Sequence, residues 1–187
     1  MRVPATFVVV RHLLGAPAAN PSELARATGL HRGTISKVLR RLPEGLLAEP
    51  WRAASWLAAL PERPSWHTLQ FDIPNPRRFR QALAEEMPGW VTGETTAPAD
   101  GIHIFATRAS LFVRPDDLGR LAPLVRAHLG VLAPAKDATV TIRAADPWLD
   151  LNETDPRAPL GQRLYDYVTD ARIAPILWSR PLAPLLS

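Results

Sequence analysis

The segment at residues 20–42, NPSELARATGLHRGTISKVLRRL, predicts two short helices joined by a tight turn. Asn20 can cap the first helix, and Pro21 suits its first position because no backbone N–H donor is needed there. Glu23 stands three residues after Asn20, where the second partner of a capping box belongs. Gly29 can adopt the left-handed conformation that a sharp turn requires. The segment therefore has the pattern of a helix-turn-helix.

The second helix is expected to begin near His31, and its apolar residues recur at helical spacing. The residues expected to face inward are Leu24 and Ala25 of the first helix and Leu30, Ile35, Val38, Leu39 and Leu42. The residues left outside are small, polar or positively charged, namely Arg32, Gly33, Thr34, Ser36, Lys37, Arg40 and Arg41. Such a face suits a helix in the major groove of DNA. Its first half would meet bases and phosphates, while Arg40 and Arg41 would follow the backbone.

A generic helical hairpin is the alternative interpretation, with the basic residues forming an ordinary solvated face. That alternative explains the amphipathic pattern of both helices. It does not account for the combination of a capped first helix, the small Ala25 at the expected crossing point and the turn at Gly29. We therefore predict a DNA-binding helix-turn-helix.

Positive charge is concentrated in the part of the chain that contains this segment. Residues 1–66 carry nine basic and four acidic side chains, whereas residues 67–187 carry thirteen and fourteen. An excess of this kind attracts a phosphate backbone.

The chain has no cysteine, which excludes disulfides, thiolate zinc sites and a cysteine nucleophile. No apolar run approaches the ~20 residues of a membrane span, and the apolar stretch at residues 7–10 is too short for a signal peptide, so we expect a cytoplasmic protein.

The helix-turn-helix is expected to lie in a winged domain that covers residues 1–64. A first helix is predicted over residues 4–14, and Leu46, Leu47 and Trp51 suit the strands of a wing. Arg52 is the best candidate for a phosphate contact from the wing, with an ordinary surface arginine as the alternative. A short helix over residues 53–60 and a proline-flanked linker at residues 61–64 would end the domain.

Residues 65–187 are predicted to form a second domain of mixed strands and helices. Strands are expected at residues 67–73, 103–107, 110–114 and 138–143, and helices at residues 76–87, 115–129 and 161–170. This order lacks the regular strand–helix alternation of a doubly wound sheet, so the fold class is α+β. On the helix over residues 76–87, a possible second DNA contact consists of Arg77, Arg78 and Arg80.

Signatures of an enzyme or a metal protein are weak in this sequence. It contains no glycine-rich phosphate loop, no nucleophile elbow and no histidine pair at metal-binding spacing. The densest acidic set, which could hold a divalent cation, is Asp146, Asp150, Glu153 and Asp155. Acidic residues beside prolines are more typical of turns and helix caps. His103, on a predicted strand beside Phe105, is expected to be structural. We therefore predict no enzymatic activity, no metal and no cofactor.

Four stretches of the second domain, in their order, resemble the C-terminal region of AbiEi-family antitoxins. They are VTGETTAP at residues 91–98, SLFVRPDDLGRLAP at 110–123, TIRAADPWL at 141–149 and APLGQRLYDYVTD at 158–170. Together with the N-terminal winged helix, the resemblance covers most of residues 1–175. Glu94 and the two threonines after it enlarge a loop that usually consists of small residues.

The resemblance implies a double-stranded DNA-binding repressor of its own operon, acting as the antitoxin of a type IV-like toxin–antitoxin pair. Its partner would be a nucleotidyltransferase-like toxin, which it would counteract without forming a stable complex. Two alternatives stay open: a winged-helix transcription regulator whose C-terminal domain senses a small molecule, and an enzyme whose site has no recognisable sequence pattern. A neighbouring nucleotidyltransferase gene would favour the antitoxin.

Overall fold

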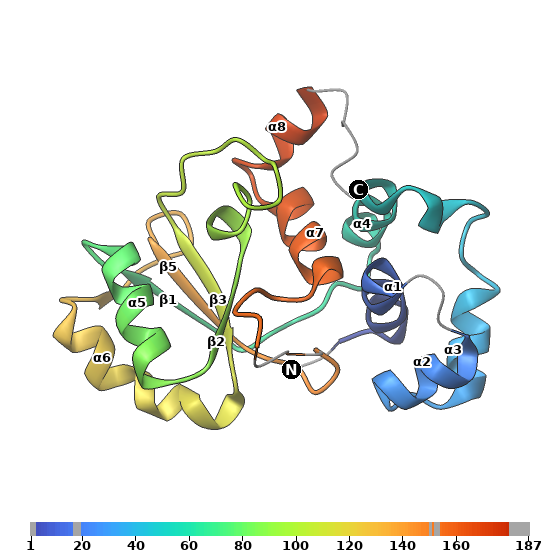
Figure 1. Ribbon diagram of the computed structural model, residues 1–187, viewed down its shortest axis with the longest axis horizontal. Coiled ribbons are helices and arrows are strands. Elements are labelled where there is room, and N and C mark those ends of the chain that lie inside the picture. Colours follow the sequence, from blue (N-terminus) through green and yellow to red (C-terminus); the bar gives the residue numbers. More distant parts are fainter. Residues whose placement is uncertain (1–2, 17–19, 150, 152–153, 180–187) are drawn as a thin grey trace.

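The computed structural model describes residues 3–16, 20–149, 151 and 154–179, with the side chains of Trp178 and Ser179 left out of the description. It shows a helical lobe beside a lobe built around a β-sheet (Figure 1). The helical lobe consists of α1 (Ala5–Gly15), α2 (Pro21–Thr28), α3 (Arg32–Leu39), the 3₁₀ helix η1 (Leu46–Ala48) and α4 (Pro50–Ala59). Helices and strands both contribute to the structure, as an α+β fold requires. Within the described residues, no helix has the length and apolar character needed to cross a membrane.

The sheet has five strands in the order β2-β3-β5-β1-β4. The strands are β1 (Thr68–Asp72), β2 (Gly89–Thr92), β3 (Ala109–Val113), β4 (Val131–Leu132) and β5 (Val140–Ala144). Strands β3 and β5 are parallel, and the other neighbouring pairs are antiparallel. The remaining elements of this lobe are α5 (Pro76–Glu86), η2 (Gly93–Thr95), η3 (Pro115–Arg120), α6 (Leu121–Ala127), α7 (Leu160–Thr169) and α8 (Ala174–Ser179).

Side-chain alternation along β3 explains how the sheet separates two groups of buried residues. Leu111 and Val113 belong to the cluster that includes Phe79 and Leu83 of α5. Phe112, between them in sequence, belongs instead to a cluster with Trp90. Neighbouring side chains of a strand point to opposite faces, so both faces of this strand are buried. Figure 1 shows α7 between the sheet and the helical lobe, away from α5 and α6.

The wing prediction is wrong, because helices form where the strands of the wing were expected. Leu46 and Leu47 lie in η1, and Trp51 lies in the first turn of α4. The described residues 40–60 contain no strand. Pro50 occupies the first helical position of α4, which suits a residue without an N–H donor. The buried residues of this helix follow at helical spacing, and they are Ala53, Ala54 and Leu57.

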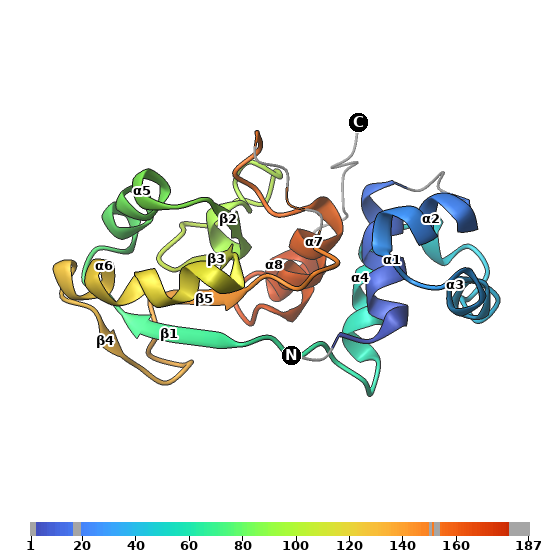
Figure 2. The ribbon, with the colours of Figure 1, turned by 90° about the horizontal axis from the view of Figure 1, so that it is seen from below.

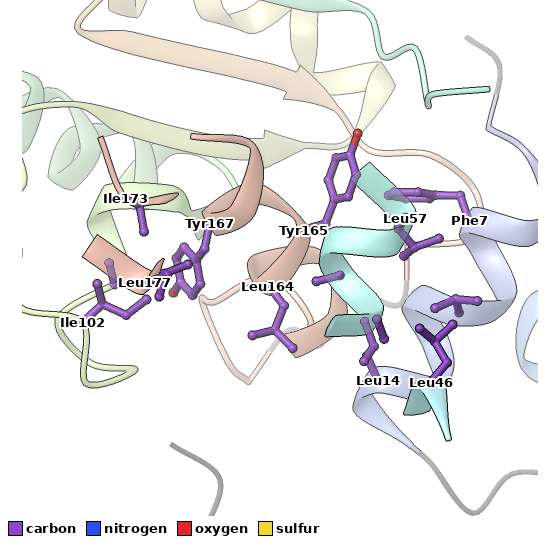
Figure 3. Packing of buried hydrophobic residues seen from close by; sticks show 14 residues of the cluster. Phe7, Leu14, Leu46, Leu57, Ile102, Leu164, Tyr165, Tyr167, Ile173 and Leu177 are labelled. Atoms are coloured by element: carbon purple, nitrogen blue, oxygen red, sulfur yellow. The ribbon is translucent and has the colours of Figure 1, made fainter. Parts of the chain in front are cut away.

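The two lobes share one hydrophobic cluster, shown in Figure 3. The helical lobe contributes buried side chains from α1, η1 and α4, including Phe7, Leu14, Leu46 and Leu57. The sheet lobe contributes Ile102, Leu164, Tyr165, Tyr167, Ile173 and Leu177. The rings of Phe7 and Tyr165 meet edge to face, with 4.7 Å between their centroids. The cluster thus crosses the boundary predicted at residue 64, and the view in Figure 2 also places α7 against α1 and α4.

Candidate nucleic-acid interface

The start of α2 has the capping arrangement that the sequence predicts. The Asn20 side-chain oxygen accepts hydrogen bonds from the backbone N–H groups of Ser22 (2.9 Å) and Glu23 (3.0 Å). In return, the Glu23 carboxylate accepts a hydrogen bond from the backbone N–H of Asn20 at 2.9 Å. A side-chain cap of this kind typically stabilises a helix by about 1 kcal/mol. The capping box therefore fixes where α2 begins.

A left-handed glycine ends α2 and turns the chain towards α3. Gly29 has φ +65° and donates its N–H to the carbonyl of Ala25 at 2.9 Å. His31 then caps α3, because its Nδ1 accepts a hydrogen bond from the Gly33 N–H at 3.1 Å. The predicted pair of helices with a short glycine turn is thus present in the structure.

A small hydrophobic cluster holds α3 against α1 and α2. Ile35 and Val38 are buried on α3, and they pack in a cluster with Leu24 of α2 and with Val9 and Leu13 of α1. Ile35 and Leu24 are completely shielded from solvent. Burial of these residues on one side determines which side of α3 faces outward.

The outward side of α3 carries most of the residues predicted to contact DNA. Arg32, Lys37, Arg40 and Arg41 are exposed, whereas Gly33, Thr34 and Ser36 are half-buried. Between Glu23 and Glu44 the sequence has five basic side chains and no acidic one. The structure therefore exposes four basic side chains on α3 and just after it, and Figure 2 shows α3 at the end of the molecule furthest from the sheet.

The other predicted contacts do not lie beside α3 on a wing. Arg52 is in the first turn of α4, where its exposed guanidinium lies 3.8 Å from the Glu49 carboxylate. Arg77, Arg78 and Arg80 are on α5. Figures 1 and 2 place α5 and α3 at opposite ends of the molecule. A duplex seated on α3 would have to extend along the whole molecule to meet α5.

The acidic residues considered as metal ligands pair with arginines in the part of the chain that the structure describes. Asp146 accepts two hydrogen bonds from the buried guanidinium of Arg11, each at 2.8 Å. Asp155 pairs with Arg157 at 3.0 Å. Asp150 and Glu153 lie outside the described residues. The structural role expected for His103 on a strand is not met, because it is exposed in an irregular segment.

No local sequence pattern indicates that Arg11 and Asp146 meet across the two lobes. Burial alone would raise the pKa of Asp146, but the hydrogen bonds and charge of Arg11 and a hydrogen bond from the Trp66 ring N–H lower it below its usual value. Gln162 accepts a hydrogen bond from Arg11 (3.1 Å) and donates one to Asp166 (3.2 Å). A polar network thus runs through the shared core.

This network extends from α7 to the sheet. Asp166 accepts hydrogen bonds from the hydroxyl of Thr92 (2.6 Å) and from Arg143 (2.7 Å). In the described part of the chain, every buried side-chain nitrogen or oxygen has a hydrogen-bond partner. A fully satisfied buried network of this kind gives rigidity and specifies one packing arrangement.

A polar cavity of about 240 Å³ opens beside this network, and it offers one place to test the alternative hypothesis of a small-molecule ligand. Its lining includes Gly93, Glu94, Arg108, Arg143 and Asp166. The charged groups already have partners: Glu94 pairs with Arg172 at 2.7 Å, and Asp166 pairs with Arg143. A ligand would therefore have to compete with existing ion pairs.

Comparison of the chain with protein-family models, with curated proteins and with solved structures gave no significant match. Function is therefore inferred from the geometry and charge of the surfaces described above.

Proposed function

We propose that this protein is a transcriptional repressor that binds duplex DNA sequence-specifically by placing α3 in the major groove. The observation that carries the proposal is the α2–turn–α3 pair, whose outward face is basic and carries small polar side chains. A major groove about 12 Å wide admits one helix, and phosphates border it on both sides. The positive end of the molecule would also attract DNA over a longer range.

The side chains of α3 divide into two roles by their chemistry. Thr34 and Ser36 carry short hydroxyls that can donate to or accept from base edges. Lys37 and Arg40 are exposed cations suited to phosphates, which give affinity without sequence information. Gly33, without a side chain, would allow close approach of the helix to the groove. In this arrangement α3 recognises a sequence without help from a wing.

The test is binding to the DNA upstream of the protein's own gene, measured across salt concentrations. Lys37→Ala/Arg40→Ala should weaken binding to all sequences and lower the magnitude of the salt slope by about 1.8, since each phosphate contact contributes about 0.9. Ser36→Ala or Thr34→Ala should instead relax sequence preference, by about 1–3 kcal/mol for a good base contact.

The matched control is Arg126→Ala/Lys136→Ala, which removes two exposed cations from the sheet lobe. It should leave both the affinity and the salt slope unchanged. If Lys37→Ala/Arg40→Ala binds as tightly as the unmodified protein, α3 is not the DNA-binding helix.

The antitoxin role extends this proposal and rests on the resemblance to AbiEi-family antitoxins. The four stretches that carry the resemblance lie in the sheet lobe, around β2–η2, β3–η3, β5 and α7. DNA binding through α3 does not depend on them, so the repressor proposal stands independently of the toxin partner.

A further inference from the structure

A second positively charged surface lies on the sheet lobe, and it has the shape of an open groove. We call it the basic groove. It has a volume of about 390 Å³, within the range of small-molecule sites. Its defining residues are Arg77 and Arg80 of α5, Phe105 and Arg108. Arg78, although on the same helix, lies outside the lining that the structure describes. Of the three α5 arginines predicted to act together, only Arg77 and Arg80 therefore line the groove.

The charged side chains that line the basic groove are all positive. No carboxylate is among the described residues that line it. Arg77 and Arg80 have no hydrogen-bond or ion-pair partner among the described residues, and Arg108 donates one hydrogen bond to the backbone carbonyl of Lys136 at 3.0 Å. The Glu94 carboxylate lies beside Arg108 but is paired with Arg172, so the cations in the lining leave a local field that attracts anions. The groove is thus complementary to a ligand with several negative charges.

Phe105 presents an aromatic ring to solvent at this groove. Its side chain is 84% exposed, the largest exposure among the large hydrophobic residues of the described chain. The segment at residues 103–107 is irregular, so the strand predicted there is wrong. The Glu94 carboxylate instead accepts hydrogen bonds from the N–H groups of Thr107 (2.9 Å) and Arg108 (3.1 Å). A buried anchor therefore holds the segment that carries the ring.

We propose that the basic groove binds single-stranded RNA, with phosphates on Arg77 and Arg80 and an unpaired base stacked on Phe105. An exposed ring in a groove that arginines also line matches both parts of a nucleotide, since bases stack on aromatic rings and arginines pair with phosphates. A paired duplex hides its base faces within the stack. RNA presents unpaired bases in its loops and ends, where aromatic side chains commonly recognise them.

The groove is separate from the proposed DNA-binding helix. Figures 1 and 2 place α5 and α3 at opposite ends of the molecule. The RNA site therefore does not rest on the DNA-binding proposal, and the two can be tested in the same full-length protein.

The experiment measures binding of a fluorescently labelled uridine octamer by anisotropy. Phe105→Ala should weaken binding by about 5- to 150-fold, the range that base stacking typically contributes, while Phe105→Trp should retain binding. Arg77→Ala/Arg80→Ala should weaken binding and lower the magnitude of the salt slope by about 1.4 for two single-strand phosphate contacts. Because Phe105 and Arg77 are exposed and Arg80 is only half-buried, the substitutions should not prevent folding, which circular dichroism of each variant checks.

Arg78→Ala is the matched control for the arginines and should leave octamer binding unchanged. Lys37→Ala/Arg40→Ala should also leave it unchanged, whatever happens to duplex binding. The proposal is overturned if Phe105→Ala binds the octamer as tightly as the unmodified protein. It is equally overturned if a duplex of unrelated sequence or a poly-glutamate peptide binds at the groove more tightly than the octamer, or if the α3 variant abolishes octamer binding.

Discussion

Helices α3 and α7 are similar in length but differ in what surrounds them. On α3 only Ile35 and Val38 are buried, and the opposite side is open to solvent. On α7 seven consecutive residues from Gly161 to Tyr167 are buried, including the polar side chains of Gln162, Arg163 and Asp166. A helix buried on all sides is a structural element of the core, whereas a helix with one free face can meet a partner. The difference supports the proposal that α3 binds a partner, and it gives α7 a structural role in the core.

The support that α7 gives depends on partners from distant parts of the sequence. Arg163 pairs with Asp100 at 2.8 Å, and Tyr167 donates its hydroxyl hydrogen to the same carboxylate. Burial and this hydrogen bond raise the pKa of Tyr167 well above its usual value, so the hydroxyl remains a donor. By contrast, the turn and the cap that set the start of α3 lie within a few residues of it, although α3 also packs on Val9 and Leu13 of α1. The comparison predicts that substitutions at α7 lower the stability of the whole molecule, whereas substitutions near α3 have local effects.

The largest effect is expected from breaking the ion pair that joins α1 to the sheet lobe. Arg11→Met should lower the free energy of unfolding by about 3–5 kcal/mol, because it leaves the Asp146 carboxylate buried without its partner. Urea denaturation measures this loss. Arg157→Met, which breaks a partly exposed pair with Asp155, should cost no more than about 1 kcal/mol. Equal losses for the two variants would show that the buried pair does not hold the lobes together.

A somewhat smaller effect is expected at Gly161, where α7 packs against the backbone of α1. A Cβ atom on Gly161 would lie 2.0 Å from the backbone carbonyl oxygen of Arg11. Backbone cannot move aside as a flexible side chain can, so Gly161→Ala should destabilise the protein by about 3 kcal/mol, the upper part of the range for overpacking. The control is Gly119→Ala, since a Cβ there meets no atom within 4 Å. Equal urea midpoints for the two variants would show that the contact between Gly161 and the backbone of Arg11 can relax without loss of stability.

The helix pair at α2 and α3 could be predicted from sequence because its determinants are local. The Asn20 cap, the Gly29 turn and the spacing of Ile35 and Val38 all lie within one short segment. The same local reasoning located α5 and α7 and the strand at β5, where the predicted and observed bounds differ by only a few residues.

The errors arose where a distant residue or a neighbouring helix determined the outcome. The sequence predicts a strand at residues 103–107, but the Glu94 carboxylate accepts hydrogen bonds from the N–H groups of Thr107 and Arg108. The expected wing was lost because Pro50 begins a helix that packs against the shared core.

The two candidate binding sites also differ in whether local sequence reveals them. The basic face of α3 is visible in sequence, because helical spacing alone separates Lys37 and Arg40 from the buried positions. The basic groove is not visible, because Phe105 and Arg108 lie about 25 residues or more from Arg77 and Arg80 and only the fold brings them to one surface. An expected strand also concealed the exposure of Phe105.

The smallest effect is expected at the cap of α2, and it tests whether damage there stays local. Asn20→Ala removes the side-chain acceptor of two backbone N–H groups and should cost about 1 kcal/mol in the free energy of unfolding. Amide hydrogen exchange should rise first at Ser22 and Glu23, while the amides of α7 keep their protection relative to global stability. Ser22→Ala is the control, because it keeps the Asn20 acceptor and should change stability by less than about 0.5 kcal/mol. If Asn20→Ala lowered protection in α7 as much as in α2, the helix pair and the shared core would unfold as one unit, and the contrast between α3 and α7 would be one of exposure alone.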